Sequence, residues 1–531
     1  MSSSQNILTV EAHDIISLLL GYDAKDKNLY FTKGESQGYI FSSCIISNTI
    51  RVSDYKIIAD KRIVFNNCEF KGNFEIQNIP QGRSIIFESC KFHNRIVFNR
   101  SIPDISFSKC FFSELTVVTT NTASKIFINS CQIFRIDITG KFSDVSIIGI
   151  SPINEKESTI KVLNVEVRRL LIQDITVNKV ELKWIKTTAF FDLAKLTVDN
   201  FSLYEISLQE SPLYFKNCVF LTLDIYSLPI EKSVGIIESE IRENLNILIS
   251  DFDELRIAKC KFIKTLNLKG VSKENTIINI SDCSISNLIF DNIVNKGSIS
   301  LRSIVENQYL AMNDSNLGET DFISCDFSKS ILNFKNSKLT NIFVSVSDFP
   351  KNKNIKTDGV YNPHQAQLAF SQFHTAFAKQ GDVVRSLEYQ AFEIEAHYNQ
   401  LNFFFKKFPF VSFRKINLGF NKYSNNFGRG WVRGLIFTIV NGAFWYFLLL
   451  VTSSNFKFNL ISYKAEDIGI GFIKFLNPVR FYDLEKLFGE SQADCFLTLN
   501  FWSYFFDGVG RIFIAYGIYQ TIQAFRRLGR T

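Results

Sequence analysis

The chain has 531 residues, so it is too long for one ordinary hydrophobic core and should form several domains or one extended repeat array. Hydrophobic residues make up 46% of it and only 9 residues are Pro, which excludes a mainly disordered chain. The formal net charge is +7, but the basic excess lies mainly in residues 401–433, which contain no acidic residue. The N-terminus lacks a basic region before its short apolar run, so we expect no signal peptide and reduced cysteines.

A repeat of about 21 residues, sometimes doubled, relates nine of the ten cysteines between residues 44 and 325. Ser239, Ser303 and Ser347 fill the positions where Cys is missing, and large apolar residues flank each small one, as in Phe65 to Phe70. In a parallel β-helix, inward side chains stack on their equivalents about 4.8 Å away in the next turn. We therefore predict a mainly β solenoid over residues 41–350 with a Cys and Ser row in its core, preceded by an N-terminal cap over residues 1–40.

Residues 132–214 repeat less clearly, and we expect a bent or looser stretch there. A metal-binding role for the cysteines would require clustered Cys and His ligands, whereas one Cys per turn forms a row. Core packing is the favoured interpretation, and neither a metal nor another cofactor is expected.

The segments "FNNCEF", "FESCKF", "FSKCFF" and "FISCDF" resemble pentapeptide-repeat proteins, because two large residues lie five apart with a small residue two before the second. The resemblance is degenerate and covers residues 41–350. It implies a right-handed parallel β-helix. Some members of that family are acidic rods that imitate DNA, but the nearly balanced charge of this solenoid does not provide the required negative face.

Residues 361–402 change to helical spacing, with Gly381 and Asp382 dividing them into two helices. We expect a helical hairpin, or neck, between the solenoid and a membrane segment. The residues expected to pack between its helices are Phe370, Phe373 and Phe377 on one side and Val384, Leu387 and Ala391 on the other. His374 and His397 lie on this hairpin, but no neighbouring spacing completes a metal or hydrolytic site, so no enzyme activity is expected.

Residues 403–433 interleave Phe with basic residues, a mixture typical of a membrane interface. The predicted interface residues are Lys406, Lys407, Arg414, Lys415, Lys422, Arg429 and Arg433. Single-stranded nucleic acid is the alternative ligand for such a segment. Lipid is favoured over nucleic acid because the segment runs directly into an apolar stretch.

Two transmembrane helices are predicted, at residues 434–456 and 495–525, with an extracytoplasmic loop at 457–494 and a tail at 526–531. The first stretch has no charge, whereas the second contains Asp507 and Arg511, four residues apart on one helical face. This is interpreted as an ion pair near the membrane surface or, alternatively, as a polar element of a pore. The loop segment "FIKFLNPVRFYDLEKLF" is expected to lie as an amphipathic helix on the outer surface.

Basic residues lie before the first span and after the second span, so we expect both chain ends to be in the cytosol. We expect the protein to lie in a bacterial inner membrane. The main functional hypothesis is a membrane-anchored solenoid that binds a protein partner of unknown identity and contacts membrane lipids, but not nucleic acid. The alternative is an oligomeric channel or membrane-perturbing effector, assembled through the transmembrane helices and gated by the solenoid.

Overall fold

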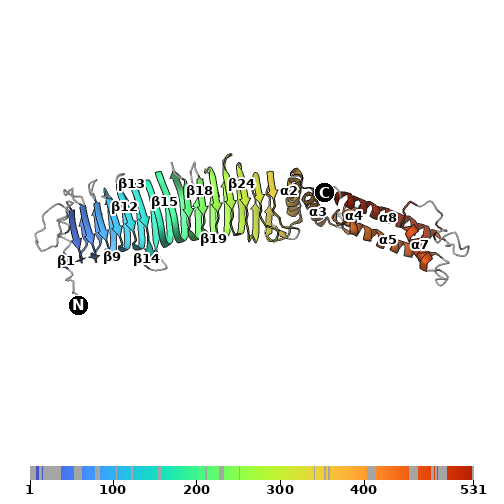
Figure 1. Cartoon of the computed structure of the whole chain (residues 1–531), viewed down its shortest axis with the longest axis horizontal. Coiled ribbons are helices and arrows are strands. Elements are labelled where there is room, and N and C mark those ends of the chain that lie inside the picture. Colours follow the sequence, from blue (N-terminus) through green and yellow to red (C-terminus); the bar gives the residue numbers. More distant parts are fainter. Residues whose placement is uncertain are drawn as a thin grey trace. The chain divides into compact units, whose positions relative to one another are not determined.

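The computed structural model describes residues 8–10, 15, 38–52, 62–77, 84–102, 104–120, 124–153, 158–209, 212–226, 233–249, 252–339, 341–351, 354–356, 359–402, 413–453, 465–479, 484, 487 and 499–528. The chain forms two compact units, Met1–Pro350 and Lys351–Thr531. The first unit is a parallel β-solenoid whose strands follow one another as successive rungs, and the second is mainly helical (Figure 1). The predicted mainly β solenoid followed by helices is confirmed at this level. Most of the predicted cap, residues 1–40, lies outside the described residues.

The solenoid strands form parallel ladders in which each strand pairs with its equivalent one turn away. The strands that precede the Cys row are β2 (Gly38–Ser42), β5 (Arg62–Asn66), β8 (Ser84–Glu88), β10 (Asp104–Ser108), β12 (Lys125–Asn129), β16 (Leu213–Lys216), β18 (Ser233–Ile237), β20 (Glu254–Ala258), β22 (Ile277–Ser281), β24 (Ser298–Arg302), β26 (Glu319–Ile323) and β28 (Asn341–Ser345). The strands on the following faces are β1 (Leu8–Val10), β3 (Cys44–Ile46), β4 (Ile50–Val52), β6 (Glu69–Phe70), β7 (Phe74–Gln77), β9 (Lys91–Arg100), β11 (Phe111–Thr119), β14 (Ser151–Pro152), β17 (Val219–Tyr226), β19 (Glu240–Ile249), β21 (Phe262–Val271), β23 (Ile285–Val294), β25 (Tyr309–Asn313) and β27 (Ile331–Lys335). Two long strands, β13 (Gln132–Ile148) and β15 (Thr159–Leu208), continue around several corners in the middle.

One corner of each turn between residues 38 and 347 is made by a residue in the left-handed conformation, with φ between 49° and 64°. These residues are Ser43, Asn67, Ser89, Lys109, Ser130, Gly149, Asp174, Lys195, Asn217, Glu238, Lys259, Asp282, Ser303, Ser324 and Val346. Most of them donate the backbone N–H to the next turn, as from Ser43 to the Asn66 carbonyl at 2.9 Å. The corner therefore keeps its backbone hydrogen bond while the chain turns.

The residue after each corner points into the core and forms the predicted Cys and Ser row. Its members are Cys44, Cys68, Cys90, Cys110, Cys131, Ile150, Ile175, Leu196, Cys218, Ser239, Cys260, Cys283, Ile304, Cys325 and Ser347, all buried. The cysteines are free thiols, and several donate to a carbonyl of the preceding turn, as Cys90 Sγ does to Phe65 O at 3.3 Å. Placing Ser303 in this row was wrong by one residue, because Ser303 makes the corner and Ile304 points inward.

The expected looser stretch between residues 132 and 214 is instead the most regular part of the solenoid. From Ile160 to Thr187 two buried side chains recur every five residues, and after one extra residue the period resumes from Phe191 to Leu208. The Cys signal disappears there only because Ile and Leu occupy the inward position after the corner. The prediction of a looser stretch was wrong because the repeat was followed by its Cys residues alone.

Burial in the core changes the acidity of the Cys row. It raises the pKa of the Cys218 thiol to about 12, from an ordinary 9.0, and it raises the pKa of Cys325 as well. An unfolded chain therefore releases these protons at lower pH than the folded chain does. The stability that this difference contributes is complete below pH 9 and is lost as the pH rises toward 12.

We therefore expect the urea midpoint of the solenoid to fall between pH 9 and pH 11, and Cys218→Ser to reduce that fall. In native protein at pH 8, a maleimide should leave the nine cysteines of the row unmodified, whereas denaturant should expose them. Rapid labelling of several of these cysteines in folded protein would contradict the buried row.

The neck consists of α2 (Pro363–Lys379) and α3 (Val383–Gln400), preceded by β29 (Ile355–Lys356). Asn362 caps α2 by accepting a hydrogen bond from the His364 backbone N–H at 3.0 Å, and Asp382 caps α3 in the same way. The predicted hairpin is present, and Ala391 is buried as expected, but not all of its packing partners are those expected. Val384 is 58% exposed, and Tyr389 and Phe392 of α3 pack against the Phe residues of α2 instead.

The remaining helices are α4 (Phe413–Asn425), α5 (Trp431–Thr452), α7 (Ala465–Phe475) and α8 (Phe501–Leu528). Helices α5 and α8 correspond to the two predicted spans, with ends shifted by several residues. The loop helix α7 begins and ends earlier than the amphipathic segment predicted within residues 472–488, and most of that segment after residue 479 lies outside the described residues.

Candidate functional site

Helix α5 is the one described helix that is long and apolar enough to cross a membrane. Its 22 residues rise about 33 Å, close to the thickness of a bilayer core. Large apolar side chains are exposed along its whole length, at Val432, Leu435, Ile436, Ile439, Val440, Phe444, Phe447 and Val451. Such a continuous exposed apolar surface is unusual in a soluble protein and suits contact with lipid.

Helix α8 runs antiparallel to α5 along its entire length. The rings of Trp431 and Phe525 lie 6.2 Å apart at one end, and Asn500 Nδ2 donates to the Thr452 carbonyl at 2.8 Å at the other. Its outer surface is also apolar, with exposed Phe501, Trp502, Tyr504, Phe505, Ile512, Tyr519, Ile522 and Phe525. The two helices therefore form one antiparallel pair, although α8 contains too many polar residues to qualify as a span by composition.

Small residues allow α5 and α8 to approach closely. A Cβ atom added to Gly434 would lie 3.0 Å from Thr521 Cα, and one added to Gly517 would lie 2.3 Å from Thr438 Oγ1. Close approach through Gly and Thr is the usual packing mode of helices in membranes, where apolar side chains gain nothing by leaving lipid. Sequence reasoning missed this seam, although Gly434, Thr438 and Gly442 recur every four residues.

Asp507 and Arg511 form an ion pair on α8, with Arg511 Nε 2.8 Å from Asp507 Oδ2. The Asp507 side chain is only 8% exposed, whereas that of Arg511 is 38% exposed. Asp507 lies one turn from Gly510, a glycine whose added Cβ would meet Phe475 of α7 and Trp445 of α5. The carboxylate is thus on the protein-facing side of α8, and its charge is balanced by the adjacent guanidinium.

Helix α7 packs onto the pair instead of standing apart as a surface helix. The Tyr446 hydroxyl donates to the Ile468 carbonyl at 2.9 Å, and Phe475 is fully buried with Tyr446, Leu449 and Ile514 in one apolar cluster.

Three of the predicted membrane-interface residues contact α3 instead of pointing into free space. Lys422 Nζ and Arg429 Nη2 lie 3.6 Å and 3.0 Å from the carboxylate of Glu395. Lys415 and Lys422 also lie over the Tyr398 ring, at 5.2 Å and 5.1 Å from its centre. These cations therefore attach the neck to the helical pair.

Arg414 and Arg433 are exposed and remain available to an external group. Lys406 and Lys407 lie outside the described residues. Of the two neck histidines, His374 Nδ1 lies 3.6 Å from Glu393 Oε2, while His397 lines a cavity together with Glu393 and Arg414. Within the described ranges no group of three or more His, Cys, Asp and Glu residues is placed to hold a metal ion.

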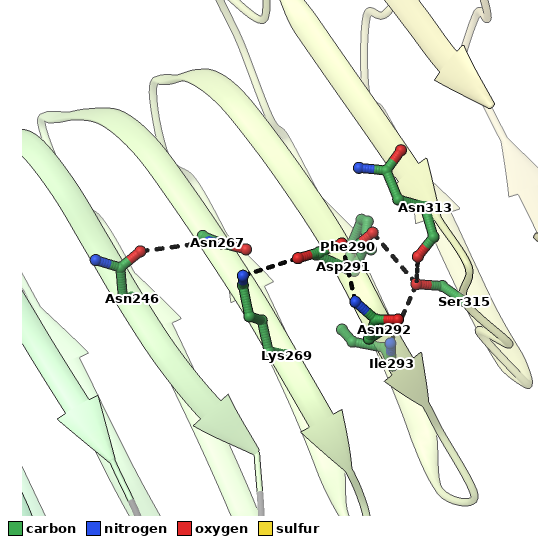
Figure 2. A network of polar contacts seen from close by, with 9 residues as sticks. All are labelled: Asn246, Asn267, Lys269, Phe290, Asp291, Asn292, Ile293, Asn313 and Ser315. Atoms are coloured by element: carbon green, nitrogen blue, oxygen red, sulfur yellow. Dashed lines mark hydrogen bonds and ion pairs between the residues drawn. The ribbon is translucent and has the colours of Figure 1, made fainter. Parts of the chain in front are cut away.

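The outer surface of the solenoid carries a ladder of hydrogen-bonded polar side chains on successive turns (Figure 2). Asn267 donates to Asn246 Oδ1 at 3.4 Å, and Lys269 Nζ lies 2.8 Å from Asp291 Oδ2. One turn earlier, Asn246 donates to Asp224 Oδ1 at 2.8 Å. These bonds join side chains of successive turns, so this face contributes to the stacking of turns.

Exposed aromatic side chains occur mainly on the central turns of the solenoid, where the Tyr226 hydroxyl donates to Asp224 of the ladder at 3.5 Å. They are Phe127, Trp184, Phe190, Tyr204, Tyr214 and Tyr226. Trp184 and Tyr204 make an edge contact at 6.2 Å between ring centres. Exposed aromatic residues are common contact points at protein interfaces.

No protein-family model matches the chain, and neither the curated proteins nor the solved structures give a match. The pentapeptide-repeat identity therefore stays a prediction, whereas the parallel β-solenoid itself is observed.

Proposed function

We propose that the chain is a two-pass membrane protein that holds a β-solenoid at the membrane surface as a binding or scaffold module. The observation that carries this proposal is the end-to-end antiparallel packing of α8 on α5. If α5 crosses a bilayer, a helix that accompanies it from Trp431 to Thr452 must cross with it. The exposed apolar surfaces of both helices support contact with lipid.

The polar residues of α8 are compatible with this topology. Asp507 faces the protein and is paired with Arg511, which lowers the free-energy cost of placing either charge in the membrane. Two spans return the chain to its starting side, so the solenoid and the C-terminus share one compartment. The basic residues near Arg414, Arg433 and Arg526 favour the cytosol as that compartment.

The solenoid supplies the binding part of the proposal. A long stack of turns offers an extended surface that contacts a partner over many repeats. The aromatic side chains on its central turns, such as Trp184 and Tyr204, are the part of this surface best suited to anchor a protein partner.

Topology can be tested by labelling in a Cys495→Ser background, since the other nine cysteines are buried. A cysteine placed at Thr531 should be shielded from a membrane-impermeant maleimide in intact cells, whereas one placed at Ser491 should react. After the membrane is permeabilised, both should react. Labelling at both positions in intact cells would leave one span and remove the antiparallel pair from the bilayer.

An oligomeric channel is the second candidate, favoured only by the ion pair between the buried Asp507 and the partly exposed Arg511. The oligomeric state in detergent separates the two functions, because a monomer supports an anchor and a symmetric ring supports a pore.

A further inference from the structure

A cavity of about 400 Å³ lies among α2, α3 and α4, next to the start of the helical pair. Six of its eight lining residues have polar side chains, and the lining consists of Gln367, Glu393, Ile394, His397, Arg414, Asn417, Leu418 and Asn421. The volume is within the range of small-molecule sites, and three different helices contribute to it.

Several polar atoms in this cavity wall have no partner within the protein. Both ring nitrogens of His397 and the side-chain oxygen of Asn421 are buried and make no hydrogen bond with any residue that the structure describes. A buried polar group without a hydrogen bond costs free energy that a bound ligand would recover. These atoms therefore distinguish the cavity from an ordinary gap between helices.

The charges in the wall define the ligand. The Arg414 guanidinium is exposed and forms no ion pair with any described residue, so it can bind an anion such as phosphate. The Glu393 carboxylate, in the same wall, lies with Oε2 3.6 Å from His374 Nδ1, and its other oxygen can accept a hydrogen bond from an ammonium group. A ligand that carries both a phosphate and a primary amine has one group for each of these side chains.

We propose that this cavity binds a phosphoethanolamine group, with its phosphate at Arg414 and its ammonium at Glu393. The proposed membrane anchoring, on which this inference rests, makes a phospholipid headgroup one source of that group. Helix α4 supports this source, because its exposed Phe413, Phe420 and Tyr423 would lie at the membrane surface. A soluble phosphoethanolamine compound is the other source of the same chemistry.

The test is calorimetric binding to the full-length protein in a nonionic detergent, which requires no assumption about how α5 and α8 cross a membrane. Phosphoethanolamine should bind at least tenfold more tightly than phosphocholine, whose quaternary ammonium has no N–H to donate to Glu393. A short-chain phosphatidylethanolamine that binds more tightly than free phosphoethanolamine identifies a lipid as the source, and equal or weaker binding identifies a soluble compound.

Two variants separate the two charges. Arg414→Gln should weaken binding of phosphoethanolamine and of inorganic phosphate, each by about tenfold or more. Glu393→Gln should leave phosphate binding intact and abolish the preference for the primary amine. The matched controls are Arg433→Gln, an exposed arginine outside the cavity, and Glu388→Gln, which is on α3 but paired with Lys351.

Equal binding of phosphoethanolamine and phosphocholine, or an Arg414→Gln protein that binds like its Arg433→Gln control, would overturn the proposal. The labelling experiment on Thr531 and Ser491 is independent of these measurements, so failure of the cavity proposal can be told apart from failure of the membrane proposal.

Discussion

Replacing Cys260 by Asp should destabilise the solenoid by about 4 kcal/mol or more. Cys260 is 1% exposed, and its Sγ lies 3.6 Å from the Ile236 carbonyl and 3.7 Å from the Ala258 carbonyl. A carboxylate there would face two carbonyl oxygens in a dry core, with no cation in position to balance it. The measurement is the urea midpoint followed by the β-sheet signal in circular dichroism.

The matched control is Cys260→Ser, because the neighbouring turn already uses Ser at this position. Ser239 Oγ donates to the Ile237 carbonyl at 2.9 Å and accepts the Cys218 backbone N–H at 3.2 Å. Cys260→Ser should therefore cost about 1 kcal/mol. If the Asp and Ser variants unfold at the same urea concentration, Cys260 does not point into the core.

Gly517→Leu is expected to separate α5 from α8. The new Cβ would lie 2.3 Å from Thr438 Oγ1 and 3.2 Å from Thr438 Cα, so rotation of the Thr side chain cannot make room for a whole Leu side chain. The effect can be read from a disulfide between cysteines introduced at Thr452 and Ser503. The hydroxyl oxygens of these two residues are 3.4 Å apart.

With Gly517 present, mild oxidation in a Cys495→Ser background should form this disulfide efficiently, whereas Gly517→Leu should reduce its yield severalfold. Gly508→Leu is the matched control, since it adds the same side chain to α8 where a Cβ meets nothing within 4 Å. An unchanged yield in Gly517→Leu would show that the two helices are not held together by this seam.

The sequence predicted the solenoid because its strongest signal, one Cys per turn, arises directly from the geometry of stacking. The same signal misplaced Ser303, since a corner residue and the inward residue after it are adjacent and either can be Ser. It also failed between residues 132 and 214, where Ile150, Ile175 and Leu196 occupy the inward row. The repeat could have been recognised in that region from its apolar residues, which recur with a period of five.

In the helical unit, the composition of the sequence predicted α5 and α8, but it did not predict which side chains contact one another. The basic residues Lys415, Lys422 and Arg429 were predicted to contact lipid, and this stays a prediction. The sequence does not reveal that Glu395 and Tyr398 of α3 lie beside them. The cavity around His397 was missed for a related reason. Its lining residues come from three different helices, and their spacing in the sequence forms no recognisable motif.

The interruption of the Cys row by Ile150, Ile175 and Leu196 has a consequence for how the chain finds its native alignment. In a stack of similar turns, pairing a strand with the wrong neighbour preserves most hydrogen bonds, so a slip by a whole turn can trap the chain in a misfolded state. A block of branched side chains among cysteines does not fit the narrower neighbouring positions equally well after such a slip. These three residues therefore mark a unique place along an otherwise repetitive molecule and favour one alignment over the shifted ones.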